Sequence, residues 1–182
     1  GITGLALALA ARDTVANIFG AISIIIDQPF NVGDWILVED IEGEVVEIGL
    51  RTTLIRSSAD TLITVPNSSL VNSPVENFSQ RRFRRIQPTF EFEANSEPNA
   101  LKSFCEKLLA IVKEDVRAVK EDSSWVRVKT FAPSMVIVAT NFYSVQSSAS
   151  QRELNEDILL VAQSIAADCG LNFHEPRMRR QH

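Results

Sequence analysis

The first thirty residues, GITGLALALAARDTVANIFGAISIIIDQPF (residues 1–30), decide how the rest of the chain is interpreted. They are apolar almost throughout, which predicts a helix that ends at Pro29, where proline removes a backbone donor. One side of this helix carries only small residues at spacings of three and four, namely Gly1, Gly4, Ala8 and Ala11. A smooth face of this kind lets helices approach one another closely. If the neighbours are copies of the same helix in a ring, Leu5 and Leu9 face the axis.

The charged pair Arg12 and Asp13 interrupts the apolar run. The uninterrupted segment is therefore shorter than the roughly 20 residues that a bilayer crossing requires. After the pair, large apolar residues recur in a strongly amphipathic pattern at Val15, Ile18, Phe19, Ile22, Ile25 and Ile26. We expect two helical halves, the first packed and pore-like and the second lying at an interface. A signal anchor and a buried helix of a soluble enzyme are the alternative interpretations.

The composition describes a globular chain of one or two small domains, with 182 residues, 45% hydrophobic and 23% charged. Its net charge of -5 argues against a dedicated nucleic-acid binder, which usually carries a basic excess. Cys105 and Cys169 have no metal-binding spacing, and each falls in a predicted helix, so we expect buried, reduced thiols. The sequence begins inside an apolar helix and without methionine, so we expect it to be part of a longer chain.

Two further segments follow the first helix. From residue 31 to about 87, short runs rich in valine, isoleucine and threonine predict five strands of a small barrel, at 34–38, 44–50, 52–56, 61–65 and 75–78. From residue 86 onward the predicted order is strand, helix, strand, strand, helix, strand, with helices at 100–119 and 153–169. This order is that of the split-βαβ, ferredoxin-like arrangement.

Four arginines surround Phe83 where these two segments meet, namely Arg81, Arg82, Arg84 and Arg85. Such a basic, aromatic segment could bind RNA or anionic lipid headgroups. The alternative is an exposed strand or linker whose arginines pair with nearby carboxylates, and we favour it because the chain is acidic overall.

Three blocks of sequence resemble the small-conductance mechanosensitive channel (MscS) family in order and spacing: GLALALAARDTVANIFGAISIIIDQPFNVGDWI, GEVVEIGLRTTLIR and VPNSSLVNSPVENFS. The resemblance covers essentially the whole chain. It implies an α+β membrane protein with a pore-lining helix at residues 1–28, an Sm-like β domain at 29–87 and a ferredoxin-like α/β cytoplasmic domain at 88–182.

The resemblance also implies the function. We expect an ion channel opened by membrane tension that releases ions and small solutes on hypo-osmotic shock, with Leu5 and Leu9 as a hydrophobic gate and a cytoplasmic cage below it. The expected partners are the lipid bilayer, permeating ions and further copies of the chain, seven in a ring, with no nucleic acid. The expected location is the bacterial inner membrane, in a multi-pass protein, with residues after about 30 in the cytoplasm.

No catalytic constellation, metal-binding spacing or cofactor motif is present in the sequence, so we expect neither an enzyme nor a cofactor. A membrane-anchored adaptor that binds RNA or lipid through the Sm-like domain and the arginines is the alternative function. The regular small residues favour the channel, because an anchor needs only hydrophobicity.

The chain departs from the family pattern where the pore helix breaks, because Arg12 and Asp13 replace a polar residue and a glycine. Gly20 is then the glycine left in the second half that could bend the helix. Arg12 and Asp13 could instead pair between adjacent subunits. After Met178 the family can continue into an axial barrel of one strand per subunit, and the sequence leaves this open.

Overall fold

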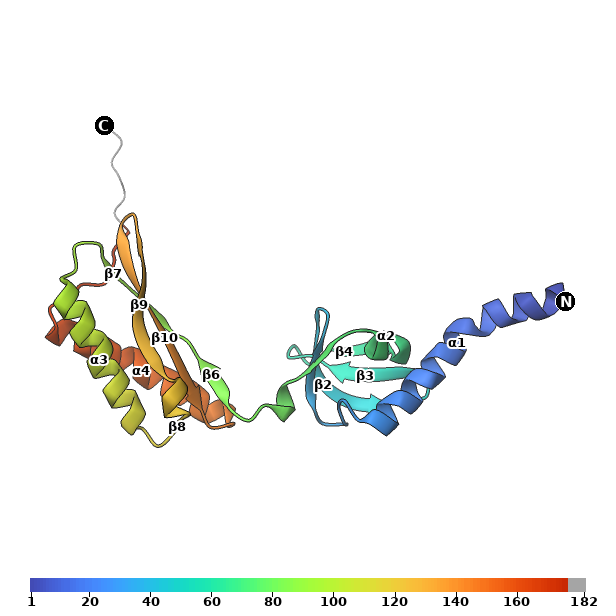
Figure 1. The fold of residues 1–182 in the computed structure, drawn as a ribbon. Helices are drawn as coiled ribbons and strands as arrows, with labels where there is room; N and C mark the ends of the chain where they lie inside the picture. Colours follow the sequence, from blue (N-terminus) through green and yellow to red (C-terminus); the bar gives the residue numbers. More distant parts are fainter. Residues whose placement is uncertain (177–182) are drawn as a thin grey trace. The chain divides into compact units, whose positions relative to one another are not determined.

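The chain forms two compact units, Gly1–Arg81 and Arg82–His182, and the computed structural model describes residues 1–176 (Figure 1). Each unit has a hydrophobic core of its own. The architecture is α+β, with a long apolar helix at the N-terminus, as the sequence predicts. The question of an axial barrel after Met178 lies outside the described residues.

The first unit begins with α1 (Ile2–Asp27), a single helix that is continuous through Arg12 and Asp13. Two separate helical halves are therefore not seen. Both charged side chains are exposed, and no proline interrupts the helix at that point, so its backbone hydrogen bonds can continue. The helix ends at Gln28, whose left-handed backbone (φ 47°) lets its N–H bond the carbonyl oxygen of Ile24 at 2.9 Å, with Pro29 directly after it.

The rest of the first unit is a five-stranded antiparallel sheet in the order β4-β3-β2-β1-β5. Its elements are β1 (Trp35–Val38), β2 (Ile41–Ile48), β3 (Thr52–Arg56), β4 (Leu62–Pro66), the short helix α2 (Asn67–Asn72), β5 (Val75–Asn77) and a 3-10 turn (Phe78–Gln80). The predicted strands lie within a few residues of these. Alternate residues point inward and bury a core that includes Ile36, Val45 and Ile55, and Ile24 of α1 joins it.

The second unit is an antiparallel sheet built around its longest strand, β10 (Met135–Ser144). One side of β10 pairs with β6 (Arg84–Ile86) and β7 (Thr89–Glu93), and the other side pairs with β8 (Ala118–Val119) and β9 (Trp125–Ala132). A bridge between Phe92 and Phe173 adds the last predicted strand beside β7, reduced to one residue pair. The resulting order is the split-βαβ arrangement expected from the sequence.

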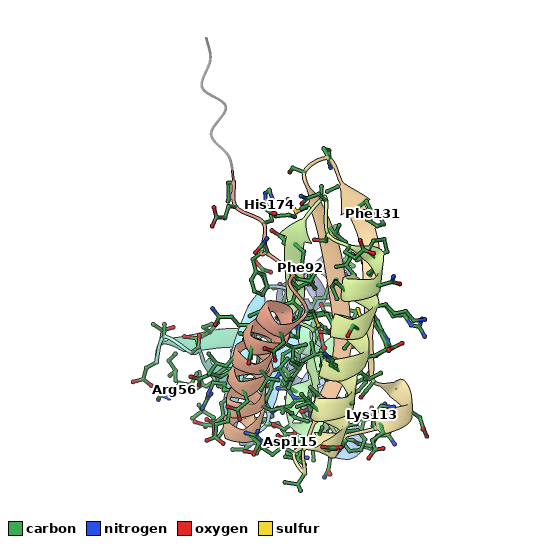
Figure 2. The ribbon with its side chains drawn as sticks, turned by 90° about the vertical axis from the view of Figure 1, so that its left-hand side faces the viewer. Arg56, Phe92, Lys113, Asp115, Phe131 and His174 are labelled. Atoms are coloured by element: carbon green, nitrogen blue, oxygen red, sulfur yellow. The ribbon has the colours of Figure 1, made fainter. Side chains whose placement is uncertain are left out.

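Helices α3 (Pro98–Glu114) and α4 (Ser148–Asp168) lie side by side on one face of this sheet (Figure 2). The core between helices and sheet is rich in aromatic rings: Phe104 of α3 meets Phe90 and Phe92 edge-on, with centroids 5.6 and 5.0 Å apart. All three rings are buried, so the unit is held by its own packing.

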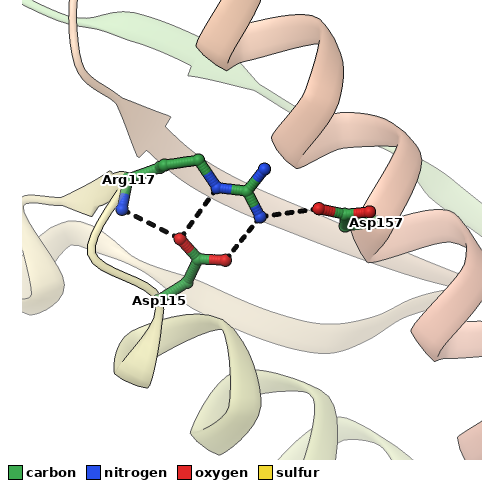
Figure 3. A network of polar contacts seen from close by, with 3 residues as sticks. All are labelled: Asp115, Arg117 and Asp157. Carbon is green, nitrogen blue, oxygen red and sulfur yellow. Dashed lines mark hydrogen bonds and ion pairs between the residues drawn. The ribbon is translucent and has the colours of Figure 1, made fainter.

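Helix α3 is shorter than the predicted helix 100–119, because the chain leaves the helix at Asp115. The Asp115 carboxylate accepts hydrogen bonds from the backbone N–H and the guanidinium of Arg117, and the same guanidinium bonds Asp157 of α4 at 2.6 Å (Figure 3). These bonds favour the extended backbone that leads into β8. The hydrogen bonds from Arg117 lower the pKa of Asp115, and those to both carboxylates raise the pKa of Arg117.

Candidate functional site

The first part of α1 is exposed along its whole length within the chain. Residues 1–16 include none that is buried, and the side chains of Leu5 and Leu9 are each 64% exposed. At 1.5 Å per residue, 26 residues reach about 39 Å, more than the roughly 30 Å of a bilayer's hydrocarbon core. By length and composition, α1 is the one helix among residues 1–176 suited to cross a membrane. Arg12 and Asp13 do not end this helix, which is continuous through both residues.

The small-residue face of α1 lies open. A Cβ added at Gly1 or Gly4 would meet no atom of the chain within 4 Å, and Ala8 is exposed while Ala11 is half-buried. Leu5 and Leu9 lie one turn apart beside this face. Arg12 and Asp13 are exposed as well, and neither makes an ion pair within residues 1–176. The structure thus leaves seven of these eight predicted residues fully available to something outside the chain, and Ala11 in part.

The last part of α1 packs on the first unit chiefly against α2, and, apart from Ile24, it does so through small and polar residues. The buried residues are Asn17, Gly20, Ala21 and Ile24, whereas the large apolar residues Phe19, Ile25 and Ile26 are 63 to 73% exposed. This second half is therefore amphipathic in the opposite sense to an ordinary soluble helix, which buries its large apolar side chains. Its outer apolar stripe needs an apolar surrounding.

Gly20 lies where α1 crosses the start of α2. A Cβ at this position would stand 2.9 Å from the carbonyl carbon of Asn67 and 3.0 Å from its oxygen. Real Cβ atoms do not approach backbone this closely, so a glycine is required for the contact. The proposed bending role of Gly20 stays a prediction, and the structure adds a packing role that the sequence did not indicate.

Asn67 is fully buried, and its polar atoms are bonded to the loop and strand behind it. Its Nδ2 donates to the carbonyl oxygen of Gly49 at 2.9 Å, its Oδ1 accepts from the Thr53 hydroxyl at 2.8 Å, and its backbone N–H donates to the carbonyl oxygen of Arg51 at 3.0 Å. Because a buried amide is costly to leave unpaired, these bonds fix α2 to the sheet.

Asn17 completes the junction from the side of α1. Its Oδ1 accepts a hydrogen bond from the backbone N–H of Ser68 at 3.0 Å. Ser68 lies in the first turn of α2, where backbone N–H groups have no partner within the helix, and the residue before the helix, Pro66, has no side chain that could cap it. Asn17 therefore caps α2 from another helix. We call Asn17, Gly20, Asn67 and Ser68 the helix junction.

Sequence reasoning missed the role of Asn17 and Asn67. Asn17 is a polar residue inside an otherwise apolar helix, which was the available signal. The arginine cluster, in contrast, is engaged within the units: Arg85 bonds the Asn141 side chain at 2.6 Å, Arg84 bonds the Gln146 carbonyl oxygen at 2.6 Å, and Arg81 bonds that of Phe78 at 2.9 Å. These contacts favour the structural interpretation of the arginines over an RNA site, but the partners are carbonyl and amide oxygens rather than the expected carboxylates.

Comparison with known proteins finds a matching family model and several relatives. A family model described as "Mechanosensitive ion channel, beta-domain" matches residues 13–80. The small-conductance mechanosensitive channel MscMJ of Methanocaldococcus jannaschii is 45% identical over 112 residues, 62% of this chain and 32% of that protein. An uncharacterised MscS family protein of Aquifex aeolicus is 31% identical over 177 residues, 97% of this chain and 48% of that protein.

Solved structures share the fold. The cryo-EM structure of Arabidopsis thaliana MSL1 aligns with a TM-score of 0.90 at 21% identity, covering 97% of this chain and 64% of that one. The crystal structure of Helicobacter pylori MscS in a closed state aligns with a TM-score of 0.82 at 22% identity, covering 100% and 70%.

In this chain an apolar helix long enough for a membrane is joined through a buried polar junction to a β domain, and the family model that matches this segment describes ion channels, not enzymes. The chain belongs to the MscS family of mechanosensitive ion channels. It spans about half or less of the length of the M. jannaschii and A. aeolicus relatives.

Proposed function

We propose that the chain is the pore helix and cytoplasmic part of a channel that membrane tension opens, releasing ions and small solutes on hypo-osmotic shock. The observation that carries this proposal is the exposure of α1: its small-residue face and its leucines have no cover within the chain, while its base is tied to a folded β domain. A helix built this way needs both a membrane and neighbours.

The neighbours are further copies of the same chain, seven in a ring. The open face at Gly1, Gly4, Ala8 and Ala11 suits close helix packing, because small residues let backbones approach. When these faces pack around a ring, the large side chains beside them turn toward the axis. Arg12 and Asp13, which have no ion-pair partner within residues 1–176, then pair between adjacent subunits.

The gate is formed by Leu5 and Leu9. Four residues apart, they make two successive apolar collars about 6 Å from each other along the axis. An ion that enters a narrow apolar ring must lose hydration that leucine cannot replace, so the closed pore stays dry. Tension widens the ring, water enters, and conduction follows from the change in radius.

The chain is then divided into a pore helix (1–28), a β domain and an α/β domain, the last two lying in the cytoplasm below a bacterial inner membrane. The boundary between these two domains falls at Arg81/Arg82 rather than at 87/88, because β6 (Arg84–Ile86) pairs with β10 of the second unit. The helix junction couples movement of the pore helix to the β domain. Because α1 and α2 contact each other through backbone at Gly20 and a buried amide at Asn67, a tilt of α1 is passed to the sheet rather than absorbed.

Single-channel recording under membrane stretch tests the proposal. Patches that contain the protein should show discrete openings whose probability rises with suction, and patches from cells that lack it should not. Suction-independent currents, or no currents from protein that is folded and inserted, would contradict a tension-gated channel.

A further inference from the structure

The two edges of the second unit differ in shape. One edge is formed by α3 and β9, and β9 pairs only with β10 among the described residues. A groove of about 610 Å³ runs between them, lined by apolar side chains that include Leu101, Leu109, Val126, Val128 and Phe131. Phe131 is 69% exposed, beside the β9–β10 turn (Figure 2). An exposed apolar groove of this kind is typical of a protein interaction site.

The partner does not add as a further strand. Val138 of β10 pairs with Val128 and Ile137 pairs with Thr130, so Lys129 is an extra, bulged residue in β9. A bulge that carries a lysine on an edge strand disrupts the row of N–H and C=O groups that an added strand would need. Docking must therefore use the side chains of the groove.

The groove has a basic rim. Lys102 of α3 and Arg127 of β9 line it, both exposed, and Lys129 is exposed next to them. Glu106 is the acidic residue in the lining. None of the three basic side chains has an ion-pair partner within residues 1–176. The partner should therefore be acidic around an apolar centre.

The opposite edge of the same unit carries acidic residues around an apolar side chain, as this partner requires. Helix α4 packs against β6 and β10, away from β9, and its outer side exposes Glu153, Glu156 and Leu160. These residues are spaced at i, i+3 and i+7, which places them along one helix face. Leu160 is 59% exposed, and neither glutamate makes an ion pair within residues 1–176.

We propose that the α4 face of one copy (Glu153, Glu156 and Leu160) docks into the α3–β9 groove of the next copy. Both surfaces belong to one chain, are complementary in charge and lie on opposite edges, so the contact is head-to-tail. A head-to-tail contact repeats around a ring or along a filament. The inference rests on the proposed function, which supplies the ring, and it identifies the faces by which the cytoplasmic units meet.

Disulfide trapping tests the contact in the protein solubilised in mild detergent. Leu160→Cys and Val128→Cys are combined in a Cys169→Ser background, with the buried Cys105 left in place. The native mass is measured first, and the sample is then oxidised and run on a non-reducing denaturing gel. We expect a ladder of cross-linked multiples, because docking brings the two positions within bonding range. The matched control pairs Leu160→Cys with Ile137→Cys, on the sheet face away from the helices.

Each outcome decides a different point. An oligomer that gives no ladder, or one in which the control pair cross-links equally well, overturns the contact and leaves the channel proposal standing. A monomer overturns both. A charge reversal gives an independent reading: Glu156→Lys should remove most of the ladder, and adding Arg127→Glu should restore it. If Glu156→Lys leaves the ladder unchanged, the basic rim does not receive α4.

Discussion

The Oδ1 atom of Asn17 accepts a hydrogen bond from the backbone N–H of Ser68 at 3.0 Å, so one helix caps the start of another fifty-one residues further along the chain. Asn17→Ala removes this acceptor from a part-buried donor, at a cost of about 1–2 kcal/mol. Hydrogen exchange at the start of α2 should accelerate by roughly 5- to 30-fold. Asn17→Asp keeps the acceptor and should retain protection. Equal exchange in the alanine variant and the wild type would contradict the cap.

Gly20→Ala should destabilise the first unit. The added methyl would stand 2.9 Å from the carbonyl carbon of Asn67, and overpacking of this kind costs about 1–3 kcal/mol. Gly4→Ala is the matched control, because its methyl meets no atom of the chain within 4 Å. Thermal unfolding in detergent should show a lower midpoint for Gly20→Ala than for Gly4→Ala. A midpoint for Gly20→Ala at or above the wild type would mean that α1 can move aside freely.

Leu9→Ser should make the closed pore easier to wet, because the hydroxyl can hold water where leucine cannot. We expect openings at lower suction or leak at rest, and the same from Leu5→Ser. Ile22→Ser, on a part of α1 that is 43% exposed, should cause no leak. Patch recordings of both leucine variants with wild-type threshold and conductance would place the gate on another face of α1.

Ala8→Leu should distort the proposed ring without unfolding the two compact units. The side chain gains three heavy atoms on a face that lies open in the single chain and packs between subunits in the proposed ring. A tight contact overpacked in this way costs about 1–3 kcal/mol per site, repeated at each subunit. Patch recording should show a non-conducting or altered channel, while the unfolding midpoint stays near that of the wild type. Normal gating would show that this face does not pack between subunits.

The Asp115–Arg117 pair should make the stability of the second unit depend on pH in the acidic range. The pKa of Asp115 is lowered in the folded chain, chiefly by its hydrogen bond from Arg117. The contribution of the Asp115 carboxylate to the free energy of unfolding is therefore fully present above its unfolded pKa of about 4. This contribution is lost as the pH falls through the lower pKa of the folded chain. Unfolding midpoints between pH 2.5 and 6 should fall less steeply for Asp115→Asn than for the wild type. Glu114→Gln, at an exposed carboxylate without an ion pair in residues 1–176, should keep the wild-type slope.

Much of the fold follows from local pattern. The apolar run before Pro29, the alternating strands that follow it and the two amphipathic helices of the second unit predict the elements because each pattern has the period of its structure. The end of α3 was misplaced by five residues, since a hydrogen bond from Arg117 to Asp115 competes with the helix. The same guanidinium is also held by Asp157, forty residues away, which no local pattern includes.

For the candidate site, the sequence by itself determined that the first helix is apolar, that it carries small residues at helical spacing and that two leucines lie beside them, because spacing along one helix is a local property. Only the tertiary structure decided which side of that helix packs on the β domain. The large apolar residues Phe19, Ile25 and Ile26 stay exposed, and the chain buries Asn17 and Gly20 on another face. The reason is that the buried face is selected by what lies across from it, the backbone of Asn67 and the N–H of Ser68. Both belong to α2, which α1 meets only in the folded chain.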